Sequence, residues 1–255
     1  MSRLLLVAGT AGVAVVLLAL AGCASSAERS AEIAARGNHL IADRGDLRIV
    51  PATDVKIGKT AVVRGDGGAA AVVEITNRSA KTKVDVPVLI DVSDRKGAEV
   101  YTNAGVGLQR SLQRIATLRP KQTVWWVNDQ LLGAEETAHR VKAKVGRSAV
   151  TAAAPKVRLT HVHWDEDSAG PYLTGTVVNP GRTLLRDVPI FAVARQHGKI
   201  VAAGRALVPK LPPAGAAAKP VKFRIVFLGK DPRHADIALT AAATVPAPAS
   251  KEASS

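Results

Sequence analysis

One segment of this chain occurs twice, at a spacing of 102 residues, and this repetition most limits what the chain can fold into. The first copy contains Asn77 and Asp85-Val86-Pro87, and the second contains Asn179 and Asp187-Val188-Pro189. The apolar positions around these identities also match. Because a unit of about 100 residues has the size of a small domain, the sequence predicts two tandem copies of one fold.

The repeated unit has the residue pattern of β-structure. In its first copy every second residue is apolar: Val84, Val86, Val88, Ile90 and Val92. Side chains alternate between the two faces of a strand, so this period of two indicates a half-buried strand. Short strands separated by turns rich in Asn, Pro and Gly are typical of β-sandwiches. The predicted fold class is therefore all-β, with two tandem β-sandwiches.

Two details of the repeated region carry further expectations. Pro87 and Pro189 each fall inside a predicted strand. Because proline lacks the N–H that a sheet ladder needs, each of these strands is expected to be an edge strand or to contain a bulge. Leu108, Leu112 and Ile115 have helical spacing, which predicts a short helix across one end of the first sandwich.

Residues 1–22 have the three parts of an export signal. Arg3 supplies a positive start, an uncharged apolar stretch runs from Leu4 to Ala21, and small residues lead to Cys23, the only cysteine. The alternative is an uncleaved membrane helix with an incidental cysteine, because about 18 apolar residues can just span a bilayer.

The residues Leu20-Ala21-Gly22-Cys23 resemble the lipobox of bacterial lipoproteins. In that family the bond before the cysteine is cut, and the cysteine thiol carries a diacylglyceryl lipid that holds the mature protein on a membrane. The resemblance implies that Cys23 is lipidated. It also implies a location at the cell membrane, facing the periplasm or the cell exterior. No other cofactor is expected.

The expected organisation follows from this signal and from shifts in composition. Small and polar residues follow Cys23, and a tail of Ala, Pro and Ser ends the chain, a composition typical of disorder. The expected segments are a signal peptide at 1–22, a lipid-anchored spacer at 23–45, β-sandwich domains at 46–146 and 155–246, and a disordered tail at 247–255.

The formal net charge of +14 at pH 7 bears on the partners of the chain. Nucleic acid is not expected, because an exported protein rarely meets it and no stacking aromatic residues alternate with the Lys and Arg residues. Besides the membrane, the expected partners are anionic envelope polymers or another envelope protein. The alternative is a generic soluble basic surface.

His161 and His163 form the best candidate for a metal site. Alternate residues of a strand share a face, so two imidazoles could reach one ion, and a carboxylate from Asp165-Glu166-Asp167 could complete the ligands. The alternative is an exposed strand that leads into an acidic turn.

Three tryptophans supply a candidate binding surface: Trp125, Trp126 and Trp164. Adjacent strand residues point to opposite faces, so one of the pair Trp125 and Trp126 is expected in a core and the other exposed or at the junction of the sandwiches. An exposed indole could anchor a sugar or a protein partner. The alternative is packing against Leu131-Leu132 or the neighbouring sandwich.

Motifs of catalysis give no indication of an enzyme. The chain has no Gly-x-Ser-x-Gly elbow and no His-Glu-x-x-His zinc motif. Gly65-Asp66-Gly67-Gly68 lacks the lysine and the following helix of a phosphate loop. We therefore expect no enzymatic activity.

The segment from Tyr172 through Leu239 resembles the small immunoglobulin-like domains of bacterial surface lipoproteins, including the FxLYD type. The residues that carry the resemblance are Val177-Val178-Asn179-Pro180-Gly181 and a partner strand entered through Asp187-Val188. The Phe-x-Leu-Tyr-Asp motif itself is absent, and Leu89-Ile90-Asp91 matches it only in part. The resemblance implies tandem immunoglobulin-like sandwiches that act as binding or spacer modules.

The expected function is that of a lipid-anchored envelope protein acting as a non-catalytic binding or structural module. Sheet edges at Pro87 and Pro189 are expected to be candidates for strand addition by a partner. The alternative is a solute- or metal-binding lipoprotein serving a transporter. That function needs a pocket between the sandwiches, near Trp125, Trp126 and the segment from His161 to Trp164.

Overall fold

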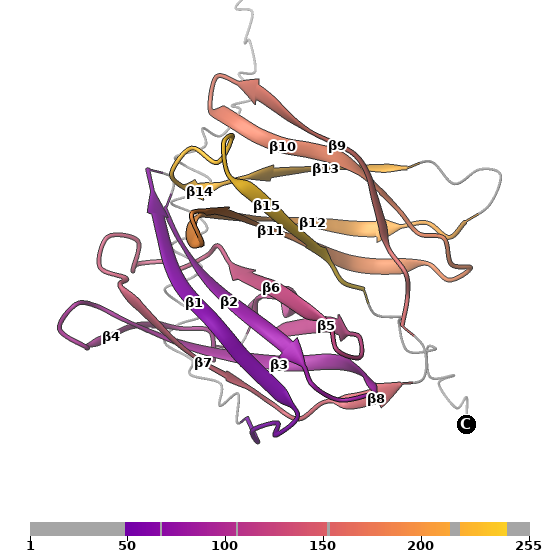
Figure 1. Cartoon of the computed structure of the whole chain (residues 1–255), viewed down its shortest axis with the longest axis horizontal. Coiled ribbons are helices and arrows are strands. Elements are labelled where there is room, and N and C mark those ends of the chain that lie inside the picture. The colour runs from indigo at the N-terminus through magenta and orange to yellow at the C-terminus, as the bar shows by residue number, and fades with distance from the viewer. Residues whose placement is uncertain (1–48, 67, 106, 152–153, 215–219, 244–255) are drawn as a thin grey trace, which may run out of the picture.

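The computed structural model describes residues 49–66, 68–105, 107–151, 154–214 and 220–243. Over these residues the chain consists of antiparallel β-sheets and a single 3₁₀ turn, as Figure 1 shows. The all-β fold expected from the alternating sequence pattern is confirmed.

The N-terminal half, residues 49–151, forms two sheets. One has the order β1-β2-β6, and in the other β3 is central and pairs with β4, β5, β7 and β8. The bounds are β1 (Val55–Gly65), β2 (Gly68–Asn77), β3 (Thr82–Ser93), β4 (Glu99–Thr102), η1 (Arg110–Leu112), β5 (Arg114–Leu118), β6 (Thr123–Asn128), β7 (Arg140–Val145) and β8 (Ala149–Thr151).

The C-terminal half, residues 154–243, also forms two sheets. Their strand orders are β13-β10-β9 and β14-β12-β11-β15. The bounds are β9 (Arg158–Asp167), β10 (Gly170–Val178), β11 (Leu185–Gln196), β12 (Lys199–Leu211), β13 (Val221–Val226), β14 (Leu228–Gly229) and β15 (Asp236–Ala241).

Figure 1 shows the four sheets as successive layers. Among the described strands, no sheet contains members of both halves. One apolar cluster nevertheless extends across the junction, since it combines most of the N-terminal core with Phe191, Val193, Ala203 and Ala242. The two halves therefore share a core, and their division into two domains stays a prediction.

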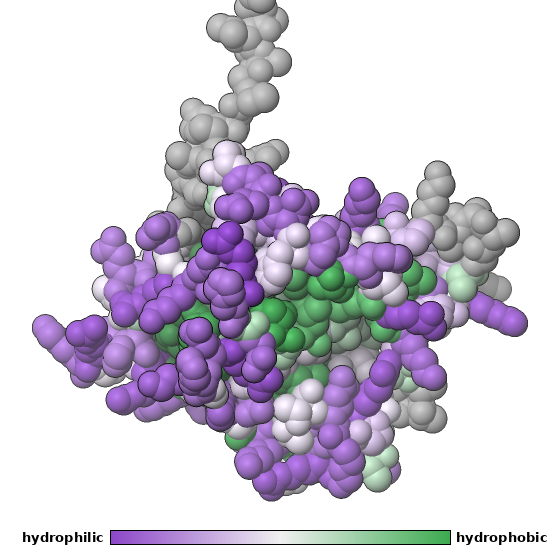
Figure 2. Space-filling view, turned by 45° about the horizontal axis from the view of Figure 1, so that its top comes forward, coloured by the Kyte–Doolittle hydropathy of each residue, from purple (hydrophilic) through white to green (hydrophobic). Residues whose placement is uncertain are grey.

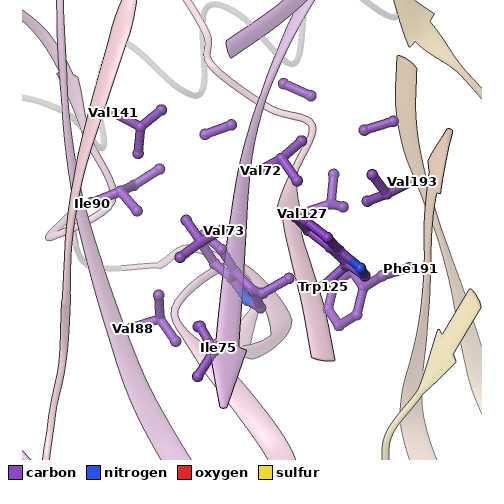
Figure 3. Packing of buried hydrophobic residues seen from close by; sticks show 14 of the residues in the cluster. Val72, Val73, Ile75, Val88, Ile90, Trp125, Val127, Val141, Phe191 and Val193 are labelled. Atoms are coloured by element: carbon purple, nitrogen blue, oxygen red, sulfur yellow. The ribbon is translucent and has the colours of Figure 1, made fainter. Parts of the chain in front are cut away.

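The sheet β1-β2-β6 is covered on both faces. Toward β3, Val73 and Ile75 point at Val88 and Ile90, as Figure 3 shows. A strand that is buried on both faces needs a continuous apolar run instead of an alternating one. β2 supplies such a run in residues 69–73, which are all at most 1% exposed.

The opposite face of this sheet packs on the C-terminal half. Figure 3 shows Val72, Trp125 and Val127 turned toward Phe191 and Val193 of β11. These side chains belong to one buried cluster. The junction between the halves is therefore an apolar sheet-on-sheet contact, which is the usual way in which two sheets bury their faces.

The repeated asparagine has the same structural role in both copies. Asn77 and Asn179 are almost fully buried at the ends of β2 and β10. The side-chain amide of each donates to the carbonyl oxygen four residues later, in Lys81 at 2.8 Å and in Thr183 at 2.7 Å. Each side-chain oxygen accepts the N–H two residues later, at 3.0 and 2.9 Å. The identity at this position therefore reflects a turn that needs both a donor and an acceptor.

The repeated Asp-Val-Pro segment also keeps its geometry. Asp85 and Asp187 have φ values of 55° and 48°, a left-handed conformation that Asp tolerates better than most residues. Pro87 and Pro189 follow in β3 and β11, but both strands are paired on two sides. The expectation that these are edge strands open to strand addition is therefore wrong. The alternative of a bulge is not seen either, because the strand register is unshifted across both prolines. The local irregularity is the left-handed conformation of the preceding aspartate.

The helix expected from Leu108, Leu112 and Ile115 is absent from the described residues, which hold only the 3₁₀ turn η1 there. Ile115 belongs to β5 and pairs with Val86 of β3. The buried Asn103 side chain donates to the Leu112 carbonyl at 2.7 Å and so fixes the turn. After this turn the chain pairs with β3 as strand β5, and this pairing prevails over the helix that the apolar spacing predicts.

Candidate functional site

The candidate metal site lies on β9, an end strand of its sheet. Thr174 pairs with His163 and Thr176 pairs with Thr160, so two residues, His161 and Val162, stand opposite one. This is a β-bulge, and His161 has a φ of 52° within it. The regular alternation that would place both imidazoles on one face is broken at His161.

The ring of His163 is already engaged. Its Nδ1 lies 2.9 Å from the carbonyl oxygen of His161, so that nitrogen is placed to donate a hydrogen bond and not to bind a metal. The Nδ1 of His161 lies 3.4 Å from the hydroxyl of Thr176. Among the described residues, no group of three or more His, Cys, Asp or Glu side chains is arranged to hold a metal ion.

The acidic residues after the histidines bind protein groups of the same sheet. The N–H of Glu166 and then the hydroxyl of Tyr172 lower the pKa of Asp165. The N–H of Ala169 and then the Arg224 guanidinium lower the pKa of Asp167. These two carboxylates therefore accept hydrogen bonds that stabilise the β9–β10 hairpin.

Arg224 connects this hairpin to β13. Its guanidinium carbon lies 3.7 Å from the ring centroid of Tyr172, and its Nη2 lies 2.6 Å from Asp167 Oδ2. The stacked ring and the ion pair therefore engage the Arg224 guanidinium and the Asp167 carboxylate. The geometry is that of a solvated, internally bonded sheet surface.

Trp125 and Trp126 do not form an exposed binding surface. Their exposed fractions are 7% and 0%, and the Trp126 indole N–H donates to the Ser111 carbonyl at 3.0 Å. Trp125 lies at the junction of the halves, next to Phe191 (Figure 3). Trp126 lies in a core and Trp125 at the junction, which is one of the two arrangements expected for this pair. Neither indole is an exposed anchor, because β6 is covered by a sheet on each face.

Trp164 is partly exposed at the rim of the C-terminal core. Its ring centroid lies 5.4 Å from that of Phe227, in a tilted pair. Figure 2 shows a hydrophobic band that crosses one face of the molecule between hydrophilic borders. Rim side chains of this core that stay partly exposed are Leu159, Trp164, Phe227, Ile237 and Leu239.

A polar network at the junction carries no motif in the sequence. Arg205 of β12 is 5% exposed in its side chain and reaches Asp129 Oδ1 at 3.0 Å. The same guanidinium donates to the side chains of Gln109 at 3.0 Å and Ser111 at 2.6 Å. A buried guanidinium needs several hydrogen-bond acceptors. Here the acceptors Asp129, Gln109 and Ser111 all belong to the N-terminal half, so these hydrogen bonds connect the two halves. The one sequence feature that could have pointed to it is an arginine amid apolar residues.

Tyr101 lies close to this network. Asn128 Nδ2 donates to its hydroxyl at 3.0 Å. Burial raises the pKa of Tyr101 to about 12. The side chain is therefore held neutral through the physiological range.

Cys23 and the lipobox residues Leu20, Ala21 and Gly22 lie outside the described residues. Within those residues, the structure contains no helix long and apolar enough to cross a membrane. Lipidation at Cys23 stays a prediction from the sequence.

Comparisons with known proteins complete the description of the site. No protein-family model matches this chain, and no curated protein is similar enough to count as a relative. The resemblance to immunoglobulin-like lipoprotein domains therefore rests on the residues of the chain itself.

Proposed function

We propose that this chain is a lipid-anchored protein of the cell envelope that acts as a non-catalytic binding or structural module. The observation that carries the proposal is the sequence Leu20-Ala21-Gly22-Cys23, which closes an apolar export signal. Acylation of Cys23 would attach the mature chain to the membrane, and the residues after it would act as a tether.

The packing of the two halves supports a module that works as one body. Trp125 and Phe191 lie in a common apolar cluster, and the Arg205–Asp129 ion pair adds a directional contact beside it. A junction of this kind holds two sheets in one orientation. The body would then present its loops and sheet faces at a fixed geometry to another envelope component.

The alternative, a solute- or metal-binding lipoprotein that serves a transporter, has less support. It needs a pocket at the junction, where Trp125 instead packs beside Phe191 and Val193. The histidines lie on β9, in a different sheet from these residues. No contact among the described residues favours this function.

The test of the anchor is the intact mass of the mature protein, made in a bacterial host with its own signal. The expected N-terminus is Cys23 carrying a diacylglyceryl group, and the Cys23→Ala variant should lack both the lipid mass and normal processing. A Ser25→Ala variant is the matched control and should be processed like the parent. A Cys23→Ala protein that is cut normally and stays on the membrane would refute the anchor.

A second experiment tests the binding role. Crosslinking in the native envelope, followed by mass spectrometry, should return the same partner in repeated preparations. If the parent protein yields no reproducible partner, the binding role fails and a spacer role remains.

A further inference from the structure

The buried Asn77 side chain holds two turns together at one end of the N-terminal half. Its side-chain amide donates to the carbonyl oxygens of Leu118 and Arg119 at 3.1 and 3.0 Å, in addition to that of Lys81. Lys121 Nζ donates to the Arg78 carbonyl at 2.6 Å across the same two turns. Residues 77–81 and 118–122 are therefore fixed side by side.

These turns place cations together. Arg119 Nη2 also donates to the Pro155 carbonyl at 3.1 Å, which brings the next residue, Lys156, to the same place. We call this surface the basic end, and its exposed members are Arg78, Lys81, Arg119, Lys121 and Lys156. None of the five forms an ion pair with another described residue.

The carboxylate that borders the basic end is neutralised from within the fold. Asp54 Oδ2 lies 2.7 Å from Lys83 Nζ, and the Lys83 side chain is only 6% exposed. Asp54 is held at this place because its carbonyl accepts the N–H of Arg78 at 2.8 Å. Among the residues that the structure describes, this ion pair leaves the five exposed cations without a carboxylate partner.

The described chain starts at Ile49 and reaches the basic end within its first six residues. Pro51 pairs with Gly146, and Asp54 follows three residues later at the Arg78 turn. The 25 residues 24–48 separate Cys23 from this point. Because 25 residues span at most about 90 Å when fully extended, a lipid on Cys23 would keep the basic end within that distance of the bilayer. Tethering of this kind raises the effective concentration of a surface at its target.

We propose that the basic end docks on the anionic headgroups of the bilayer that carries the lipid anchor; this inference rests on the proposed lipidation of Cys23. Attraction between a basic surface and anionic lipids acts only within about a Debye length of 8–10 Å. The end where the tether enters is the part of the body best placed to come that close.

The test measures vesicle binding by the mature chain, residues 23–255, with Cys23→Ala so that no lipid contributes. The probes are vesicles of phosphatidylcholine alone and of phosphatidylcholine mixed with phosphatidylglycerol. The parent should bind the anionic vesicles, lose binding as salt is raised, and ignore the neutral vesicles. The quadruple variant R78Q, K81Q, R119Q and K121Q should bind the anionic vesicles at least about tenfold more weakly.

The matched control removes the same charge at the equivalent end of the C-terminal half. The variant R182Q, R186Q, K210Q and K222Q changes four exposed residues there and should keep most of the parent's binding. Circular dichroism and urea unfolding check that both variants fold. Variants that unfold are replaced by the pair R78Q with K81Q and the pair R182Q with K210Q, which remove equal charge.

Several outcomes overturn the proposal. An equal loss in both quadruple variants would show a general charge effect. Equal binding to neutral vesicles, or no binding to anionic ones, would exclude headgroup docking. Binding to soluble polyphosphate without vesicle binding would assign the surface to an envelope polymer. The mass of the parent N-terminus is measured separately, so failure of docking is distinguishable from failure of the anchor.

Discussion

Arg205 Nε lies 3.0 Å from Asp129 Oδ1, and this ion pair connects β12 of the C-terminal half to the residue that follows β6 in the N-terminal half. The Arg205 side chain is 5% exposed and that of Asp129 is 23% exposed. Because an ion pair requires its two groups to face each other, this pair restricts how the two halves can be oriented within the apolar contact. It also makes the junction sensitive to the loss of one partner.

Asp129→Ala should therefore lower the free energy of unfolding by about 2–3 kcal/mol, because Arg205 keeps its charge in a buried place without its carboxylate. Urea unfolding measures the change. Asp231→Asn, which breaks an exposed pair with Arg233 at 2.6 Å, is the control and should leave the midpoint nearly unchanged. A loss for Asp129→Ala no larger than that of the control would contradict the role of the pair.

Val193 and Asp91 occupy matching positions of the repeat and face different surroundings. Val193 is fully buried at the junction, whereas Asp91 lies on the outer face of β3. Val193→Asp should cost about 3–5 kcal/mol because it places a carboxylate in an apolar contact, and Asp91→Val should cost less than about 1 kcal/mol.

The milder variant Val193→Ala keeps this prediction testable if Val193→Asp does not fold. It should cost about 2 kcal/mol through lost packing. Thermal and urea unfolding of the Val193 and Asp91 variants are compared with the parent. Similar losses in the free energy of unfolding for the Val193 and Asp91 variants would show that Val193 at the junction does not contribute to the core.

Asn77→Ala should destabilise the chain by about 3 kcal/mol, because its side chain serves carbonyls of two turns that would be left without a donor. Asn179→Ala should cost less, about 2 kcal/mol, because its amide reaches Thr183 and, at 3.4 Å, Leu211. Urea unfolding of both variants gives the order. A larger loss at Asn179 would reverse the ranking.

Tyr101 makes the fold sensitive to alkali. Its ordinary pKa is 10.0, and burial raises the folded value to about 12. The neutral side chain stabilises the fold fully below pH 10, and this contribution is lost as pH rises from 10 toward 12. The expected loss is about 2–3 kcal/mol.

Urea unfolding between about pH 9 and pH 12 measures this loss, with Tyr101→Phe as the comparison. The variant lacks the ionisable hydroxyl, so its stability should fall less steeply than that of the parent over this range. Parallel curves for the two proteins would exclude Tyr101 as the cause. Lysine titration acts on both proteins and cancels in the comparison.

The strands were predictable because local residue patterns decide them. The alternation through Val84 and Val92 requires one buried face, and the repeated Asn-x-Ser or Asn-Pro-Gly turns end the preceding strands. The match between Asn77 and Asn179 extends from sequence identity to the same hydrogen bonds. Local chemistry is sufficient for these elements.

The geometry of the candidate metal site at His161 and His163 was less predictable, because it depends on how β9 pairs with the neighbouring strand β10. The spacing of His161 and His163 assumed a regular strand, but the bulge opposite Gly175 depends on pairing with β10. The predicted edges at Pro87 and Pro189 failed for a related reason. Proline removes one donor, but it does not say which strands lie on either side.

The sequence by itself determined the β-strands, their turns, the repeat and the candidate lipid anchor at Cys23, because each of these is encoded within a few neighbouring residues. Only the tertiary structure decided that Trp125 is buried, that Arg205 meets Asp129 and that the basic end forms around Asn77. The physical reason is that these contacts join residues far apart in the chain. Val72 and Val193 lie on a second apolar face of their strands, and such a face is buried only when another sheet covers it.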